Sequence, residues 1–254
     1  MSRTVRKALI LAAGEGTRLR PLTDDLPKPM LPVAGKPVLE HIVNWLRHHG
    51  VSQIAVNLHH KPRPVIDYFG DGRHWGVEIR YSVEERILGT AGAAKRLQLF
   101  LDETFVVAYG DVLTDLDLGA LIAFHCSASA GFHRTRPIAT LALYHVPNPT
   151  ECGIVTLDPA GRIVRFVEKP PRDAVFGDLA NAGIIVLDPA LLDLIPPDTF
   201  FDFGGDLFPL LLAQDIPMFG WPIRPGDYLL DMGTLEKYRQ AEQDVKTGRW
   251  HPLG

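Results

Sequence analysis

The sequence predicts an α/β protein whose three layers surround a mostly parallel, mixed sheet. Strand-like and helix-like segments alternate through the first half of the 254-residue chain, as they do in β-α-β units with parallel strands. The second half has more strand-like segments, separated by proline and glycine turns. Because no low-complexity linker or internal repeat interrupts the chain, we expect a single domain over residues 1–254.

The elements of the first half follow from their apolar patterns. A continuous apolar run in 7–13 favours a strand that is covered on both faces. Apolar residues at helical spacing in 38–50 predict a helix that Gly50 ends. Thr90 is the expected N-cap of a later helix. The remaining expected elements are strands over 53–58, 77–83 and 104–111, a short helix over 64–72 and a helix over 90–100.

The second half predicts four strands and then two helices. Its expected strands are the segments 137–146, 153–158, 162–169 and 181–188. Its expected helices are the segments 205–214 and 235–248.

Composition and charge narrow the class of protein. Apolar residues make up 46% of the chain and charged residues 22%, and the net charge is −4. This balance indicates neither a nucleic-acid-binding surface nor a basic membrane patch. Two cysteines, Cys126 and Cys152, are too few for a disulfide framework, and no apolar run is long enough to cross a membrane. We therefore expect a cytoplasmic protein that partners neither nucleic acid nor membrane.

The segment LILAAGEGTRLRPLTDDLPKPMLPVAGKP, residues 9–37, begins as a strand and continues as an irregular loop with five prolines. It carries Gly14, Gly16, Arg18, Arg20 and Lys28. A buried strand that leads into a rigid, basic, glycine-bearing loop is typical of a phosphate site. The dinucleotide-binding pattern fails because residue 19 is a leucine, and the chain has no Walker G-K-[ST] triplet.

Residues 11–37 resemble the amino-terminal motif of the sugar-phosphate nucleotidylyltransferases, and the resemblance continues in the family's order. The later motifs are LGTAGA, YGD, FVEKP, NAGIIV and YLLDMGT. The resemblance implies a single Rossmann-like nucleotidyltransferase domain with a strand-rich, sugar-binding half. Residues 1–115 would bind mainly the nucleotide, and 116–254 would bind mainly the sugar phosphate and include the carboxy-terminal helix. We expect no C-terminal left-handed β-helix, because nothing after the helix near 234–248 leaves room for one.

The resemblance implies a transferase that joins a nucleotidyl group from a nucleoside triphosphate to a sugar 1-phosphate and releases pyrophosphate. Arg18 would steady the departing pyrophosphate, and Lys28 would bridge the reacting phosphates. Such phosphoryl transfer is mainly positioning and electrostatics. The nucleotide-binding residues implied by the resemblance are Leu11, Ala12, Ala13, Gly14, Gly16, Thr17, Glu84, Gly89 and Thr90.

Asp111 and Asp231 are the candidate metal ligands, since each follows a strand-like run and each falls at one of the family's metal positions. Two carboxylates completed by phosphate oxygens and water suit Mg²⁺, the expected cofactor. The nearby pair Asp115 and Asp117 has the D-x-D form of a metal-dependent glycosyltransferase. We interpret it as the start of a helix instead.

The resemblance places the sugar-phosphate contacts in the strand-rich half. Lys169 would meet the phosphate, Glu168 the sugar hydroxyls, and Gly153 and Asn181 the remaining sugar groups. Cys152 departs from the family, which often has an aromatic residue there.

The expected base and sugar follow from the loop YSVEERILGTAGA, residues 81–93. The LGTAG motif of this loop resembles that of the mannose-1-phosphate guanylyltransferases, and Glu84 stands where the thymidylyl enzymes tend to have a glutamine. A carboxylate only accepts hydrogen bonds, and guanine offers two adjacent donors. GTP-binding and a manno-configured sugar 1-phosphate are therefore expected. In a second interpretation Glu84 faces solvent and backbone groups near Gly89 read the base.

Four alternatives remain open at this point. The enzyme could be a uridylyltransferase or thymidylyltransferase that acts on glucose 1-phosphate or another sugar 1-phosphate. Outside the family, it could be a metal-dependent glycosyltransferase or a catalytically silent nucleotide-sugar sensor. A homo-oligomer is also left open.

Overall fold

A computed structural model describes residues 5–127 and 137–253 and divides the chain into two compact units. Unit 1 consists chiefly of Leu88–Val107 and Gly119–Ile223. Unit 2 consists of Arg6–Ile87, Ala108–Leu118 and Arg224–Gly254. The halves expected from the sequence were contiguous, whereas each of these units is assembled from separate segments of the chain.

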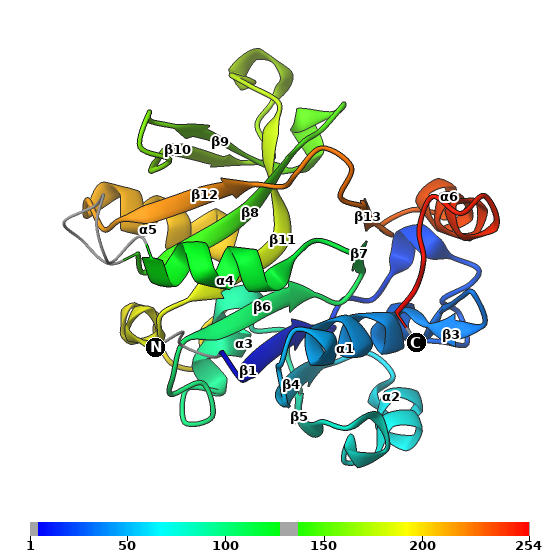
Figure 1. The fold of residues 1–254 in the computed structure, drawn as a ribbon. Coiled ribbons are helices and arrows are strands. Elements are labelled where there is room, and N and C mark those ends of the chain that lie inside the picture. The colour runs from blue at the N-terminus through cyan, green and yellow to red at the C-terminus, as the bar shows by residue number, and fades with distance from the viewer. Residues whose placement is uncertain (1–4, 128–136, 254) are drawn as a thin grey trace. The chain divides into compact units, whose positions relative to one another are not determined.

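The centre of unit 2 is a parallel β-α-β arrangement, as its alternating pattern predicts (Figure 1). The apolar run of β1 is buried at its three central residues, as a strand covered on both faces requires. Strand β4 lies in the middle, because it pairs in parallel with both β1 and β5. The elements in chain order are β1 (Lys7–Leu11), α1 (Val38–His48), β4 (Gln53–Leu58), α2 (Pro62–Phe69), η3 (Arg73–Trp75) and β5 (Glu78–Val83).

The rest of unit 2 consists of short elements that carry the proline-rich loop and the carboxy-terminal helix. Strand β13 pairs antiparallel with β7, and Asp231 lies opposite Val112 in that pairing. Helix α6 begins at an N-cap, Thr234, whose hydroxyl accepts from the backbone N–H of Lys237. These elements are η1 (Thr17–Leu19), η2 (Lys28–Met30), β2 (Pro32–Val33), β3 (Lys36–Pro37), β7 (Val112–Thr114), β13 (Leu229–Asp231) and α6 (Leu235–Lys246).

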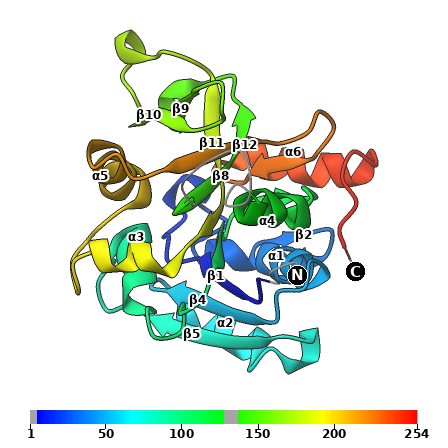
Figure 2. The ribbon, with the colours of Figure 1, turned by 60° about the vertical axis from the view of Figure 1, so that its left-hand side comes forward.

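Unit 1 is richer in antiparallel strands. Strand β8 pairs antiparallel with β11 and parallel with β12, while β9 pairs antiparallel with β10 and β11 (Figures 1 and 2). Phe208 of α5 packs edge-on against Phe166 of β10, with ring centroids 5.1 Å apart. The helices are α3 (Gly89–Arg96), α4 (Leu118–Ser127), η4 (Pro149–Glu151), η5 (Arg172–Ala174), η6 (Pro189–Leu194), η7 (Phe203–Leu207) and α5 (Phe208–Ala213). The strands are β6 (Phe105–Tyr109), which crosses between the units, β8 (Ala139–His145), β9 (Gly153–Leu157), β10 (Ile163–Glu168), β11 (Leu179–Leu187) and β12 (Met218–Pro222).

The α/β class with a mixed sheet is confirmed, and one local prediction is wrong. Thr90 is not an N-cap, because α3 already begins at Gly89. The carboxylate of Asp202 accepts from the Thr90 backbone N–H at 2.8 Å, which is the bond that a capping side chain usually supplies. Strands β7 and β12 are additions that their short patterns did not predict. In the described part of the chain, no helix combines the length and the apolar character that a membrane span requires.

Candidate functional site

The loop that follows β1 is folded tightly onto the proline-rich segment. Gly16 has a positive φ of 68°, a conformation that suits glycine. A Cβ at this position would lie only 3.0 Å from the Cβ of Lys28 and 3.0 Å from the Cγ2 of Thr23. The Thr23 hydroxyl also donates to the Gly16 carbonyl at 2.9 Å. The glycine therefore sets the position of the segment that carries Lys28.

Lys28 is an inward-facing residue at the start of η2, between Pro27 and Pro29. Its side chain is only 13% exposed, and its ammonium group donates to Oδ2 of Asp111. The solvated surface role that a lone lysine usually has is thus excluded.

Pairing between β7 and β13 brings Asp111 close to Asp231. Asp111 directly precedes β7, and its carbonyl accepts from the Met232 backbone N–H at 2.8 Å. Burial raises the pKa of Asp231, and the neighbouring charge of Asp111 raises it further, while Lys237 and Lys28 oppose both effects. The Lys237 ammonium lies 3.5 Å from Oδ2 of Asp231.

The acid pair has an unsatisfied acceptor. Oδ1 of Asp231 is buried and has no hydrogen-bond partner among residues 5–127 and 137–253. An orphaned carboxylate oxygen beside a second carboxylate fits a divalent cation. Over the same residues, no group of three or more histidine, cysteine or acidic side chains could hold a metal ion.

Arg18 belongs to the same cluster. Its Nη2 atom lies 3.1 Å from the position that a Cβ on Gly233 would occupy, two residues after Asp231. Arg18 itself is exposed. Unit 2 thus brings together Arg18, Lys28, Asp111 and Asp231, which the sequence predicted as the catalytic and metal-binding residues.

Glu84 lies inside unit 2, only 2% exposed. Its Oε1 accepts from Nδ2 of Asn57 at 3.0 Å, and Oδ1 of Asn57 accepts from the backbone N–H of Ala12 at 2.8 Å. The interpretation in which Glu84 faces solvent is therefore wrong. Asn57 escaped the sequence analysis, although an amide at the end of the apolar strand QIAVNL was a signal that could have been noticed.

The acids of the D-x-D pattern have structural partners. Oδ1 of Asp115 accepts from the backbone N–H of Tyr228 at 2.6 Å, and Asp117 pairs with Arg224 at 3.0 Å. Both acids therefore brace the segment that leads into β13. Helix α4 starts at Leu118, so the pair precedes a helix as expected.

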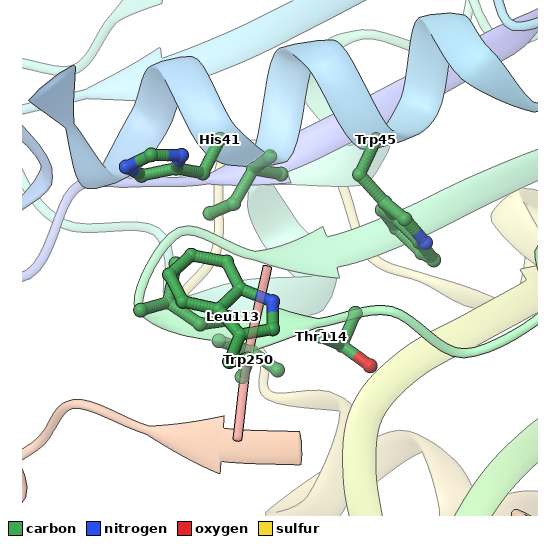
Figure 3. Close-up of a pocket in the computed structure, with 7 residues that line it drawn as sticks. His41, Trp45, Leu113, Thr114 and Trp250 are labelled. Carbon is green, nitrogen blue, oxygen red and sulfur yellow. The ribbon is translucent and has the colours of Figure 1, made fainter. Parts of the chain in front are cut away.

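A small cavity lies between α1 and β7, the strand that directly follows Asp111 (Figure 3). His41 and Trp45 of α1 line it together with Leu113, Thr114 and Trp250. The rings of His41 and Trp250 meet edge-on, with centroids 5.1 Å apart, and Trp250 is 3% exposed. The strand next to Asp111 is thus packed against an aromatic cluster.

Three of the predicted sugar-phosphate residues lie on neighbouring strands of unit 1, and the fourth, Lys169, directly follows β10. Glu168 of β10 is opposite Gly153 of β9, and Asn181 belongs to β11, which pairs with β9 one residue away. A Cβ at Gly153 would lie 2.6 Å from Oε2 of Glu168, so glycine allows this carboxylate to approach. Burial raises the pKa of Glu168, and the charge of Asp202 adds to the increase. Lys169 is 66% exposed and lies 3.7 Å from Glu168.

The nucleotide candidates Gly89 and Thr90 belong to unit 1, whereas the candidates Leu11, Ala12, Ala13, Gly14, Gly16, Thr17 and Glu84 belong to unit 2. The Thr90 hydroxyl bonds to Asp202 at 3.0 Å and accepts from the backbone N–H of Phe203 at 2.8 Å. Gly89 has a φ of 75°, and a Cβ there would lie 2.6 Å from the carbonyl oxygen of Phe201. The turn at the start of α3 is therefore tied to the segment 201–203.

Two curated relatives align with almost the whole chain. A UTP–glucose-1-phosphate uridylyltransferase of Synechocystis sp. is 39% identical over 253 residues, which cover 94% of this chain. A mannose-1-phosphate guanylyltransferase of Mycobacterium tuberculosis is 37% identical over 246 residues, which cover 95% of it. The chain spans 63% and 65% of the lengths of these two relatives.

A solved structure and a family model agree with this likeness. The structure of HddC from Yersinia pseudotuberculosis, complexed with GMP-PN, matches with a TM-score of 0.76 and 26% identity. That match covers 95% of this chain and all of the other. The nucleotidyl transferase family model matches residues 7–248, and the chain therefore belongs to the nucleotidyl transferase family.

Proposed function

We propose that the protein is a sugar-1-phosphate nucleotidylyltransferase. A sugar-phosphate oxygen attacks the α-phosphorus of a nucleoside triphosphate, a new P–O bond forms, the bond to the β-phosphate breaks, and pyrophosphate leaves. The observation that carries this proposal is the cluster of Lys28 and Arg18 around the two carboxylates Asp111 and Asp231 at the end of the glycine-bearing loop.

The chemistry of this reaction suits those residues. The attacking phosphate oxygen is ionised at neutral pH, so no general base is required. The barrier lies in bringing two polyanions together and in stabilising the charge of the leaving group. The inward-facing Lys28 would stabilise the reacting phosphates, Arg18 would hold the pyrophosphate, and backbone N–H groups of the loop would orient the triphosphate.

Asp111 and Asp231 would hold Mg²⁺, which would neutralise phosphate charge when bound. This proposal is supported by Oδ1 of Asp231, a buried oxygen for which residues 5–127 and 137–253 provide no hydrogen-bond partner. Lys28 forms an ion pair with Asp111, and its charge would help to hold this carboxylate in place.

The strands β9, β10 and β11 would supply the sugar-phosphate site. The exposed Lys169 would meet the phosphate, and Glu168, whose side chain is 34% exposed, would accept hydrogen bonds from the sugar hydroxyls. Asn181 and the backbone of Gly153 would complete these contacts. Gly89 and Thr90 would contribute to the nucleotide site.

For the substrates, we propose GTP and a manno-configured sugar 1-phosphate. The support is the LGTAG motif and the similarity to the guanylyltransferase of M. tuberculosis. UTP with glucose 1-phosphate is the second candidate, since the uridylyltransferase of Synechocystis is similarly related.

The test is pyrophosphate release across a matrix of four triphosphates and several sugar 1-phosphates, with and without Mg²⁺. We expect release only when all three components are present, and fastest with GTP and mannose 1-phosphate. A preference for UTP or dTTP would overturn the substrate proposal. Sugar transfer from a nucleotide-sugar, without pyrophosphate chemistry on any pair, would overturn the reaction.

A further inference from the structure

Asn57 occupies a junction in unit 2. It lies near the end of β4, the middle strand of the parallel set, opposite Leu11 of β1 and Ser82 of β5. The next residue after Leu11 opens the glycine-bearing loop, and Glu84 directly follows β5. The side chain of Asn57 is 3% exposed and bonds to both of these segments.

Both bonds require one orientation of the amide. Ala12 offers an N–H donor, so it must face the carbonyl oxygen of the Asn57 side chain. The carboxylate of Glu84 offers acceptors, so it must face the NH₂ group. A reversed amide would set donor against donor and acceptor against acceptor. Donor and acceptor types therefore match along the whole path from Glu84 to the loop.

Glu84 is also fixed through its backbone. Its N–H donates to the Leu58 carbonyl at 2.7 Å, and its carbonyl lies 2.8 Å from Nδ1 of His59. Both the side chain and the main chain of Glu84 are thus tied to the end of β4, with 2% of the residue exposed. These contacts suit a residue that holds a loop in place more than one that contacts a ligand.

We propose that Asn57 is a positioning residue of the nucleotide site, and that Glu84 acts on the nucleotide through Asn57 and Ala12 without reading the base itself. This inference rests on the proposed function. Together the two side chains fix the first residue of the loop that orients the triphosphate. Their loss would weaken the binding of every nucleoside triphosphate to a similar degree.

The experiment exchanges the amide and the carboxylate of the hydrogen bond between Asn57 and Glu84. Asn57→Asp places a carboxylate against that of Glu84. The double variant Asn57→Asp/Glu84→Gln restores the bond with its polarity reversed, since the carboxylate introduced on β4 would accept both from Ala12 and from the new amide. Asn44→Ala, at a buried asparagine of α1, is the matched control for loss of an amide in unit 2. Thermal unfolding of each variant shows whether it has folded.

We expect Asn57→Asp to raise the KM of each triphosphate about tenfold or more, in line with the cost of mispairing a buried polar group. The KM of the sugar 1-phosphate should change less than twofold. The double variant should return the triphosphate KM to within about threefold of the wild type, with the ranking of the four bases unchanged. The affinity of each variant for the triphosphate can also be measured by calorimetry without sugar phosphate, so that no reaction takes place. The affinities should rank the variants in the same order as the KM values.

Two results would overturn this inference. A double variant that regains affinity but shifts its ranking toward UTP or dTTP would show that the Glu84 carboxylate reads the base. A folded Asn57→Asp variant with unchanged triphosphate KM would show that the bond has no positioning role. Failure of the proposed function would look different, because the wild type itself would release no pyrophosphate from any substrate pair.

Discussion

Two lysines lie beside the acid pair Asp111 and Asp231, and their different burial predicts different losses of kcat when each is mutated. Lys28 contacts Asp111, with side chains 13% and 24% exposed. Lys237 lies 3.5 Å from Asp231, with side chains 37% and 36% exposed. Substitution by methionine removes the charge from either lysine and keeps a side chain of similar length. The pair of variants therefore compares an inward-facing charge with a half-exposed charge at one cluster.

The expected magnitudes follow from this difference in burial. A unit charge about 4 Å from charge that develops on the reacting phosphates is worth about 4 kcal/mol at an effective dielectric constant of about 20. Removing one preorganised contact of this kind commonly costs about 10²–10³-fold in kcat. A half-exposed ion pair contributes only about 0.2–1 kcal/mol, or at most about fivefold. We therefore expect Lys28→Met to lower kcat about 10²–10³-fold, and Lys237→Met to lower it less than about fivefold.

The assay is the initial rate of pyrophosphate release, with kcat and both KM values fitted for each variant. A transition-state role requires the loss in Lys28→Met to fall on kcat more than on KM. Measurement at rising Mg²⁺ concentration separates loss of charge stabilisation from weakened cation binding. Added Mg²⁺ should restore the rate only where the variant binds the cation more weakly. A Lys28→Met variant with near-normal kcat, or an equal loss in Lys237→Met, would refute the reasoning.

Three further predictions concern the acid pair and its support. Asp111→Asn and Asp231→Asn should each abolish turnover and weaken Mn²⁺ binding to the free protein at least about tenfold by calorimetry, since each removes one of two carboxylates; normal binding in either would exclude it as a ligand. Trp250→Ala should lower the free energy of unfolding by about 3–5 kcal/mol in urea, because a buried indole leaves a cavity; a change below about 1 kcal/mol would show that the aromatic cluster does not support the fold. Burial lowers the pKa of His41, so below about pH 6.5 the unfolded chain binds a proton there that the folded protein does not. Stability should therefore fall as the pH drops from about 7 to 5, and His41→Gln should flatten that slope; an unchanged slope in urea titrations would contradict the assignment.

Local patterns predicted the regular elements well where burial decides them. The apolar run of β1, the helical stripe of α1 and the segment of β4 occupy the places that their sequences indicated. Thr90 shows where local reasoning fails. It has the residue type of an N-cap, yet the capping bond comes from Asp202, which is 112 residues away. No local pattern can contain a partner at that separation.

The candidate site was predictable only where its residues belong to sequence motifs. Arg18, Lys28, Asp111 and Asp231 were recognised through long motifs, and their proximity in unit 2 agrees with the role expected of them. Asn57 carries no motif, because the pattern of β4 predicts only that a strand is buried. Its role appears once the register places it between two loops that are distant in sequence.

The pairing of β7 with β13 has a consequence for synthesis of the chain. Asp111 and Asp231 are 120 residues apart, and most of unit 1 is encoded between them. At about 5–20 residues per second, the ribosome delivers the second acid about 6–24 s after the first. During that interval Lys28 is already available to neutralise Asp111, whereas β7 still lacks its partner strand. A nascent chain can therefore form the β-α-β centre of unit 2 early but completes the two-carboxylate cluster only after residues 229–231 have emerged.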